Sequence, residues 1–228
     1  MAAPPVNLLS VCAGIGGIDL GLRLAIPGLR TVCYVEREAY AAAVLAARME
    51  EGRLDPAPIW SDVANFDGTE WRGCVDILAA GFPCQPFSFA GKRQGEDDER
   101  FIWPDIARII GECRPGYVFL ENVALDAFRR PRADLADMGY RVPPAVCIGA
   151  VHVGAPHRRL RWWCLAVADA IGAGLEERQG QQGHDGEERQ AAERGGPVGN
   201  SIGVREPQPE GLEPEERRCL GHPRLAGN

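Results

Sequence analysis

The sequence contains no Cys-x-x-Cys pair, although eight cysteines are distributed along its 228 residues. Structural zinc sites are usually built from such pairs, so we expect no metal site. No apolar run approaches the ~20 residues of a membrane-spanning helix. The first residues also lack the charged and apolar regions of a signal peptide. These absences predict a cytoplasmic protein with reduced thiols and no membrane contact.

An overall excess of positive charge is missing as well. The formal net charge is −7 at pH 7, which argues against non-specific binding of polyanions but leaves room for a local basic groove. The hydrophobic content of 45% and charged content of 25% are ordinary for a globular protein. The length suits one domain with a sizeable core.

Aromatic residues are absent from the last 60 residues, which contain 12 glycines. A segment this polar has little apolar surface to offset the entropy lost on ordering. We therefore expect a folded domain over residues 1–168 and a low-complexity, disordered tail over residues 169–228.

The chain opens with a pattern typical of nucleotide-binding α/β proteins. An apolar strand is predicted over residues 6–11 and a helix after Gly17, and a glycine-rich turn joins them. A second strand over residues 31–35 ends at Glu36, where an acidic side chain suits ribose hydroxyls. Taken singly, the turn could be an ordinary tight turn and Glu36 a solvated carboxylate. A third short strand is predicted over residues 59–63, with Asp62 at its end.

Three further buried strands each have a chemically useful group at one end. The run over residues 75–80 stops at Gly81 and leads through Pro83 to Cys84. A lone cysteine is more often a small buried hydrophobe than a nucleophile. The strand over residues 117–120 precedes Glu121, and a turn with Arg159 and Arg161 joins a β-prone segment, 141–153, to a strand over 162–167. An alanine-rich helix is predicted over residues 39–49, an amphipathic helix over 101–113 and a further helix over 125–138.

Together these features resemble the C5-cytosine DNA methyltransferases across roughly residues 6–168. The match is carried by Ala13-Gly14-Ile15-Gly16-Gly17, Glu36, Asp62-Val63, Gly81-Phe82-Pro83-Cys84-Gln85, Phe87-Ser88-x-Ala90-Gly91, Glu121-Asn122-Val123 and Gly154-x-Pro156-x-x-Arg159-x-Arg161. The fold expected from this resemblance is a mostly parallel, doubly wound α/β sheet that binds S-adenosylmethionine at the carboxyl ends of its strands.

The chemistry of the family explains these residue types. A thiolate, here Cys84, adds to carbon 6 of cytosine, so that carbon 5 can attack an electrophilic methyl group. The resemblance gives protonation of N3 to Glu121, oriented with the base by Arg159 and Arg161. The base that removes the carbon 5 proton is not identified. Because the cytosine lies inside double-stranded DNA, base flipping is implied.

The resemblance also assigns contacts to the cofactor and to DNA. The glycine turn would hold the methionine part of S-adenosylmethionine, Glu36 its ribose, and Asp62 with Val63 its adenine. The expected cofactor-binding set is Cys12, Ala13, Gly14, Ile15, Gly16, Gly17, Glu36, Arg37, Asp62, Val63 and Pro83. The expected DNA-binding set is Gln85, Ser88, Lys92 and Arg93, the last three on a loop, residues 86–100, that would close over the cytosine. Cys12, Arg37 and His157 depart from the residues that the family usually has.

The family's target-recognition region is not visible in the sequence. Gly199-Asn200-Ser201 matches the family's final motif superficially, but the 37 residues of 162–198 are too few for a recognition domain. A truncated or split subunit that is inactive without a second chain supplying the target-recognition region is therefore an alternative. An RNA cytosine methyltransferase is another.

Overall fold

The computed structural model describes residues 5–83 and 102–169. Contacts divide the chain into a unit Met1–Gly172 and a unit Ala173–Asn228, and every described residue belongs to the first. Within the described ranges, no helix has the length and apolar character needed to cross a membrane.

One mixed, mostly parallel sheet runs through the first unit in the order β3-β2-β1-β4-β5-β8-β6, with β7 paired to β8. Strands β1 to β5 are parallel, and β8 is antiparallel to β5, β6 and β7. The strands are β1 Val6–Val11, β2 Leu29–Val35, β3 Ile59–Trp60, β4 Ile77–Gly81, β5 Tyr117–Asn122, β6 Tyr140–Arg141, β7 Val146–Gly149 and β8 Leu160–Ala168.

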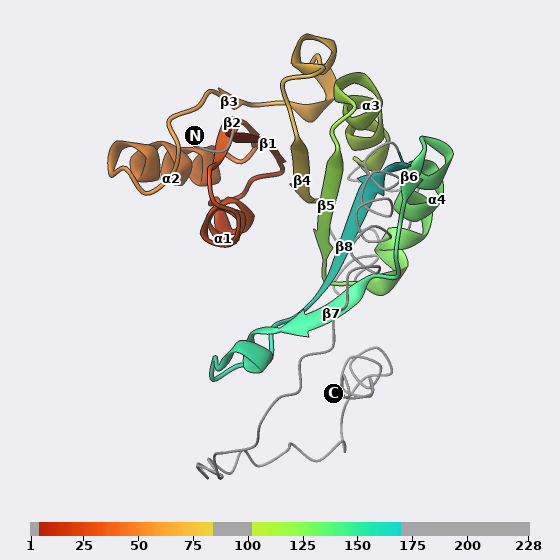
Figure 1. The fold of residues 1–228 in the computed structure, drawn as a ribbon. Helices are drawn as coiled ribbons and strands as arrows, with labels where there is room; N and C mark the ends of the chain where they lie inside the picture. Colours follow the sequence, from red (N-terminus) through yellow and green to blue (C-terminus); the bar gives the residue numbers. More distant parts are fainter. Residues whose placement is uncertain (1–4, 84–101, 170–228) are drawn as a thin grey trace, which may run out of the picture. The chain divides into compact units, whose positions relative to one another are not determined.

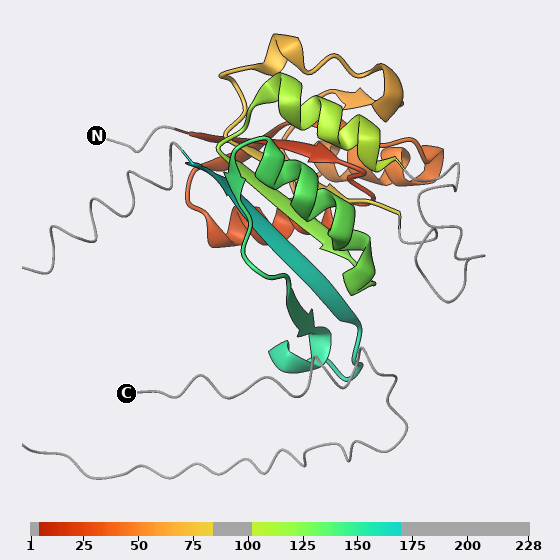
Figure 2. The ribbon, with the colours of Figure 1, turned by 90° about the vertical axis from the view of Figure 1, so that its right-hand side faces the viewer.

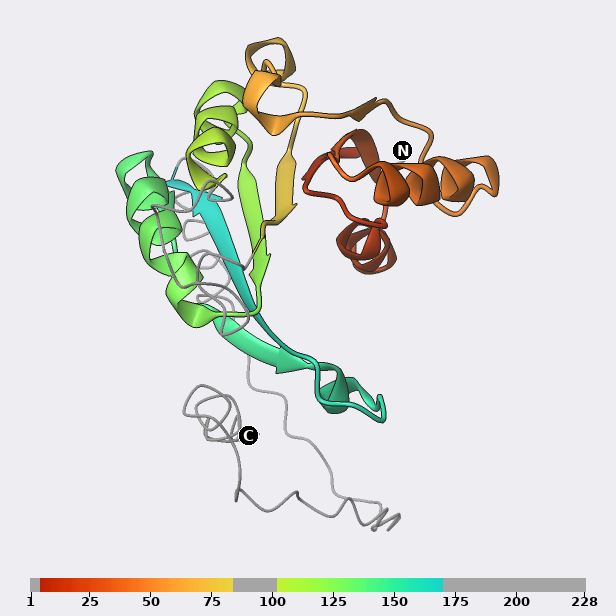
Figure 3. The same ribbon diagram turned by 180° about the vertical axis from the view of Figure 1, so that it is seen from behind.

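Helices lie on both sides of this sheet. Helices α1 and α2 lie on one side and α3 and α4 on the other (Figures 1 and 3). The helices are α1 Gly17–Ala25, α2 Ala39–Glu50, α3 Trp103–Cys113 and α4 Arg129–Asp137, with short 3-10 turns at η1 Val63–Asn65, η2 Thr69–Trp71, η4 Leu125–Phe128 and η5 Ala150–Val153. The expected doubly wound α/β fold is confirmed.

The apolar periodicity of the sequence explains the packing of two helices. Ile18 and Leu22 of α1 pack on Leu8 and Ile77 of the sheet. On the other side, α3 buries one face that contains Ile106, Ile109 and Ile110. Arg114 ends α3 in a left-handed conformation, directly before Pro115.

Two predicted strands are shorter than expected. The third strand stops at Trp60 because the Asp62 carboxylate accepts a hydrogen bond from the Ala64 amide (3.0 Å) and caps η1 instead. The β-prone segment over residues 141–153 is interrupted between β6 and β7, where Pro143 and Pro144 cannot donate ladder hydrogen bonds. Its end forms η5 rather than strand.

A buried hydrogen-bond network ties α1 to β1 and β2. The Ser10 and Thr31 hydroxyls donate to the Asp19 carboxylate at 2.8 and 3.0 Å. Burial raises the pKa of Asp19, which is 1% exposed, although these two hydrogen bonds oppose the shift.

Five described cysteines, Cys12, Cys33, Cys74, Cys113 and Cys164, carry free thiols. The cytoplasmic location stays a prediction.

The topology fixes where a ligand can bind. The strand order reverses at β1, since β2 lies on one side of it and β4 on the other. In open α/β sheets the crevice at such a switch point, at the carboxyl ends of the strands, is the usual ligand site.

Candidate active site

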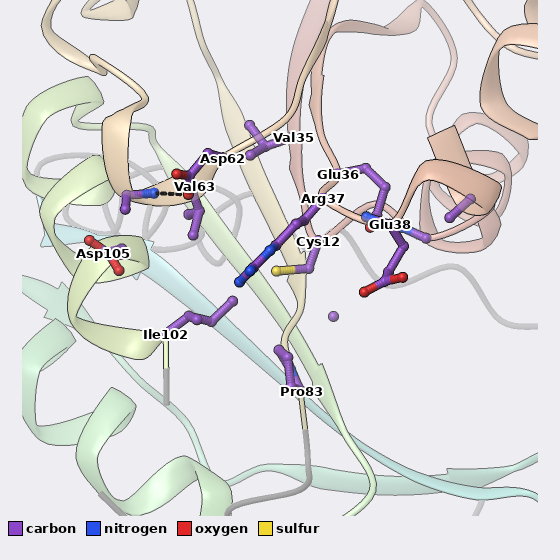
Figure 4. A pocket seen from close by; sticks show the side chains of 14 residues that line it. Cys12, Val35, Glu36, Arg37, Glu38, Asp62, Val63, Pro83, Ile102 and Asp105 are labelled. Atoms are coloured by element: carbon purple, nitrogen blue, oxygen red, sulfur yellow. Dashed lines mark hydrogen bonds between the residues drawn. The ribbon is translucent and has the colours of Figure 1, made fainter. Parts of the chain in front are cut away.

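A cleft of about 770 Å³ lies at this switch point (Figure 4). Its walls come from the segments that follow β1, β2 and β4, from η1 and from the start of α3. The lining residues are Cys12, Gly14, Val35, Glu36, Arg37, Glu38, Ala41, Asp62, Val63, Ala64, Gly81, Pro83, Ile102 and Asp105. A volume of this size accommodates a nucleoside-sized ligand.

Glu36 is the most firmly held polar group of the cleft. One carboxylate oxygen accepts from the Gly14 amide (2.6 Å) and the other from the Glu38 amide (2.8 Å). The residue is only 8% exposed, so these two amides fix its orientation. Each carboxylate oxygen has a second lone pair, which leaves acceptor capacity for ligand hydroxyl groups.

Gly14 allows this arrangement because its φ of 55° lies in the left-handed region that glycine adopts without steric cost. A Cβ at this position would meet no atom within 4 Å, so the backbone faces open space.

Asp62 and Val63 line the wall formed by η1. Figure 4 also shows the Arg37 side chain extending into the space between Cys12 and Ile102. The cleft therefore has carboxylates at its rim, an arginine across it, and apolar walls from Val35, Val63 and Ile102.

Cys12 lines the cleft but is a poor nucleophile. Burial, followed by the nearby Glu36 carboxylate, raises the pKa of its thiol to about 12. The thiol therefore stays protonated at neutral pH and contributes a small apolar surface.

Part of the expected cofactor-binding set does not line the cleft. Ala13, Ile15, Gly16 and Gly17 are absent from its walls, and Ala13 packs against the cluster of Tyr34, Leu45 and Leu54. A Cβ on Gly16 would stand 2.6 Å from Leu54 Cδ1, and the φ of Gly16 is 80°, so packing and the left-handed backbone both favour glycine there. A glycine pattern alone does not separate packing from ligand contact.

Sequence reasoning missed several lining residues, namely Val35, Glu38, Ala41, Ala64, Gly81, Ile102 and Asp105. The sequence could have predicted Glu38, since it lies two residues after Glu36 at the end of a strand. Ile102 and Asp105 had none, because they reach the cleft only through the packing of α3.

Glu121 and Arg161 form an ion pair beside the cleft, with Arg161 Nε 2.9 Å from Glu121 Oε1. Burial raises the pKa of Glu121, and the positive charges of Arg161 and then Arg159 oppose that rise. Arg159 is exposed, and its φ of 36° is unusual for a residue with a side chain.

Gly81 is where the cleft and this ion pair meet. It lines the cleft and pairs with Glu121 in the β4–β5 register. A Cβ on Gly81 would stand 3.5 Å from Glu121 Oε2 and 3.9 Å from the Cys12 carbonyl oxygen. The structure thus brings together the expected residues Glu36, Glu121 and Arg161 around one region.

Asn122 is a further polar residue whose side chain joins two strand ends. It is 1% exposed; its amide group donates to the Phe82 carbonyl (3.2 Å) and its oxygen accepts from the Ala124 amide (3.2 Å). Phe82 also packs near Trp103 and Phe128. The backbone is therefore anchored as far as Phe82, directly before Pro83.

Several expected residues lie outside the described ranges. These are Cys84, Gln85, Ser88, Lys92 and Arg93, and also Gly199, Asn200 and Ser201. In the part of the chain that is described, no group of three or more His, Cys, Asp or Glu side chains could hold a metal ion.

The fold and the cleft define an α/β protein with a cleft at the switch point of its sheet, beside a partly buried carboxylate–arginine pair. The C-5 cytosine-specific DNA methylase family model matches residues 6–191, and the chain belongs to this family.

Individual relatives agree with this assignment. The type II methyltransferase M.CviJI of Paramecium bursaria Chlorella virus IL3A is 34% identical over 168 residues, covering 70% of this chain and 42% of the relative. M.HpaII of Haemophilus parainfluenzae is 40% identical over 175 residues, covering 73% and 47%. The chain thus spans less than half the length of these two relatives.

A solved structure shows the same fold. The S. pombe Dnmt2 methyltransferase superposes with a TM-score of 0.58 at 22% identity, covering 72% of this chain and 51% of that chain. At this identity the likeness concerns the fold alone.

Proposed function

We propose that the chain is the donor-binding and catalytic part of an enzyme that methylates carbon 5 of cytosine in double-stranded DNA. The observation that carries the proposal is the meeting at Gly81 of the cleft with the Glu121–Arg161 pair. Cys84, the proposed nucleophile, comes three positions after Gly81 in the sequence.

The polar and apolar groups that line the cleft suit S-adenosylmethionine. The oriented Glu36 carboxylate can accept hydrogen bonds from two ribose hydroxyls. Val35, Val63 and Ile102 offer apolar surface to an adenine ring, and Asp62 offers an acceptor for its amino group. When bound, the cofactor supplies the electrophilic methyl group.

The residues of the chain carry out the other parts of the reaction. The Cys84 thiolate adds to carbon 6 while the Glu121 carboxyl group gives its proton to N3, which makes carbon 5 nucleophilic. After methylation, a base outside the assigned set removes the proton from carbon 5. The carbon–sulfur bond then breaks, N3 returns its proton to Glu121, and Cys84 is released as a thiolate. Arg161 holds Glu121 in place, and Arg159 orients the cytosine oxygen.

Partial burial suits Glu121 for this role. A carboxyl group with a raised pKa keeps its proton at higher pH and can donate it near neutrality. Covering the site with DNA would remove further water from Glu121 and raise its pKa more.

The decisive experiment measures transfer of tritiated methyl groups from S-adenosylmethionine to mixed-sequence duplex DNA. Transfer should disappear in Cys84→Ser and in Glu121→Gln, but persist in Cys74→Ser, which changes an exposed free thiol. Transfer that survives Cys84→Ser would contradict the mechanism. Running the same assay with RNA tests whether RNA is the acceptor.

The partial coverage of the relatives favours a second candidate function. A chain that matches 42% and 47% of M.CviJI and M.HpaII could bind the donor but fail to turn over alone. Calorimetric titration with S-adenosylmethionine separates the two candidates, because binding without transfer identifies an incomplete enzyme.

Glu36→Gln should weaken donor binding by about tenfold or more, since hydrogen bonds to a charged acceptor are lost. Glu51→Gln, an exposed carboxylate on the surface, is the matched control. Equal affinities of the two variants for S-adenosylmethionine would show that Glu36 does not bind the cofactor.

A further inference from the structure

Arg108 of α3 contacts one wall of the cleft from the side that faces away from the cleft. Its Nη2 donates to the carbonyl oxygens of Val63 (3.0 Å) and Ala64 (3.2 Å), and its Nη1 donates to the Phe66 carbonyl (2.8 Å). Val63 and Ala64 line the cleft, whereas Arg108 does not. One guanidinium group therefore binds three backbone carbonyls of the segment that forms the η1 wall.

Glu112, one turn further along α3, fixes the guanidinium group. Its Oε1 and Oε2 accept hydrogen bonds from Arg108 Nη1 at 2.9 and 2.8 Å. Oε2 also accepts from the Gly68 amide (2.8 Å). The side chains of Arg108 and Glu112 are 35% and 23% exposed, so the ion pair contributes orientation more than stability.

The side chains of α3 that face the η1 segment recur at helical spacing. Ile102 directly precedes the helix, and Asp105, Arg108 and Glu112 follow it at spacings that keep them on one side. Ile102 and Asp105 line the cleft, and Arg108 reaches the backbone of η1. Figure 2 shows the orange-to-yellow segment that contains η1 and η2 running alongside the yellow-green helix α3.

The other hydrogen bonds of η1 are local. The Asp62 carboxylate accepts from the Ala64 amide, and the Asn65 side-chain oxygen accepts from the Trp60 indole nitrogen (2.7 Å). Among the described residues, Arg108 makes the only hydrogen bonds that join η1 to a helix. The last carbonyls of a helical turn have no partner within it, and arginine side chains can provide one. Helix α3 therefore holds this wall through Arg108.

We propose that Arg108 is a positioning residue for the donor, because it sets the distance between the η1 wall and the α3 wall of the cleft. This inference rests on the proposed function, in which Asp62 and Val63 bind the adenine of S-adenosylmethionine. Val63 belongs to one wall and Ile102 to the other (Figure 4). Arg108 does not touch the ligand and acts through the backbone of η1.

The planar guanidinium group is what suits Arg108 to this task. It has five N–H donors in a fixed arrangement, so it can bind several carbonyls while it pairs with a carboxylate. A lysine would keep the positive charge beside Glu112 but has no fixed donor geometry. A methionine would keep an apolar stem and lose every donor. These two substitutions separate the hydrogen bonds to η1 from charge and from packing.

Arg72 provides a matched control within the same region. It donates to the carbonyls of Glu112 (2.8 Å) and Gly111 (3.2 Å), at the end of α3 away from the cleft. Arg72→Met therefore removes arginine hydrogen bonds to two carbonyls and leaves every hydrogen bond of η1 in place. A general weakening of the domain would appear in the variants of both arginines.

The test compares two ligands by calorimetric titration. These are S-adenosylhomocysteine, the demethylated form of the donor, and S-inosylhomocysteine, in which an oxygen replaces the 6-amino group of adenine. Asp62 can accept a hydrogen bond from the amino group but not from that oxygen, so the wild type should prefer the adenine ligand by about tenfold or more.

Arg108→Met should weaken binding of the adenine ligand by about tenfold or more and reduce the preference to less than about threefold. Arg108→Lys should fall between the wild type and the methionine variant. Arg72→Met should keep the affinity and the preference of the wild type within about twofold.

A second measurement needs no ligand. The Trp60 indole N–H donates to Asn65 of η1, so its nitrogen-15 NMR signal reports where η1 lies. The signal should shift in Arg108→Met and stay in place in Arg72→Met. An unmoved signal in Arg108→Met would show that Arg108 does not hold η1.

Three binding results would also overturn the proposal: an unchanged preference in Arg108→Met, an equal loss of both ligands in that variant, or the same effects in Arg72→Met. If Arg108→Met does not fold, Arg108→Lys decides, and a wild-type preference in it overturns the proposal. Failure of the wild type to bind either ligand would instead contradict the proposed function, and the Trp60 signal would still decide whether Arg108 holds η1.

Discussion

Glu121 is subject to two opposing influences on its charge. Burial disfavours its ionised form and dominates, while Arg161, 2.9 Å away, and the more distant Arg159 favour it. A carboxyl group whose folded pKa is raised contributes stability below its unfolded pKa of about 4.3, and that contribution is lost as the pH rises through the folded pKa. The proposed acid is therefore held at some cost to neutral-pH stability.

Arg161→Met tests this balance, because it removes the nearest positive charge and keeps an apolar stem. The pKa of Glu121 should rise further, so the free energy of unfolding should fall by a larger amount than in the wild type as the pH rises above the unfolded pKa of about 4.3. Carbon-13 titration of the Glu121 carboxyl group, with urea unfolding at each pH, measures both effects. Arg159→Met is the control and should cause a smaller shift; an unmoved Glu121 pKa in Arg161→Met would contradict the account.

Asn122 lies beside Glu121 and has a structural task that can be separated from catalysis. Asn122→Ala leaves the Phe82 carbonyl and the Ala124 amide without their partners in a buried place, which should cost about 1–3 kcal/mol in the free energy of unfolding. Asn122→Asp keeps the acceptor for Ala124 but places an acceptor against the Phe82 carbonyl. It should be no more stable than the alanine variant. Urea unfolding decides, and changes below about 0.5 kcal/mol in both variants would show that the contacts are dispensable.

Among the secondary-structure elements, apolar periodicity predicted α1, α2, α3 and the strands of the sheet's centre, since burial of one face determines them. Periodicity predicted the wrong lengths for β3 and for the segment of β7. The Asp62 cap ends β3 early, and Pro143 and Pro144 interrupt the strand before β7. At the site, Glu36, Glu121 and Arg161 were predicted because each follows or begins a buried strand. Ile102 and Asp105 were not, because their place in the cleft depends on how α3 packs in three dimensions.

The glycine turn before α1 offers a matched pair of substitutions. Gly16 has a φ of 80°, and an added Cβ would crowd Leu54 and Leu45. Gly16→Ala should therefore lower the free energy of unfolding by at least about 1–2 kcal/mol, the cost of the left-handed backbone, to which crowding against Leu54 and Leu45 adds. Gly17 begins α1, with open space at its Cβ. Gly17→Ala should be neutral or stabilising by up to about 1 kcal/mol.

Thermal unfolding of these two variants, measured without ligand, tests whether the fold itself needs glycine at position 16 but not at position 17. If both alanine variants were equally destabilised, the left-handed backbone of Gly16 would not be the cause.

At the scale of the whole molecule, the described residues that line the cleft and form the ion pair all belong to the unit Met1–Gly172. The family model reaches residue 191, so the sequence match alone does not locate the functional boundary. Asp169, the last described residue, still donates a hydrogen bond through its amide to the Gly139 carbonyl (3.0 Å), so the contacts of the first unit extend at least this far.

A chain that stops after Gly172 should therefore bind S-adenosylmethionine with an affinity within about twofold of the full chain. The reason is that Glu36, Asp62 and the Glu121–Arg161 pair obtain their positions from strands β1 to β8 and their connections. Calorimetric titration measures the affinity, and thermal unfolding with saturating donor should show equal ligand-induced stabilisation in both forms. Loss of binding in the shortened chain, with its sheet still folded by circular dichroism, would show that residues beyond 172 complete the cleft.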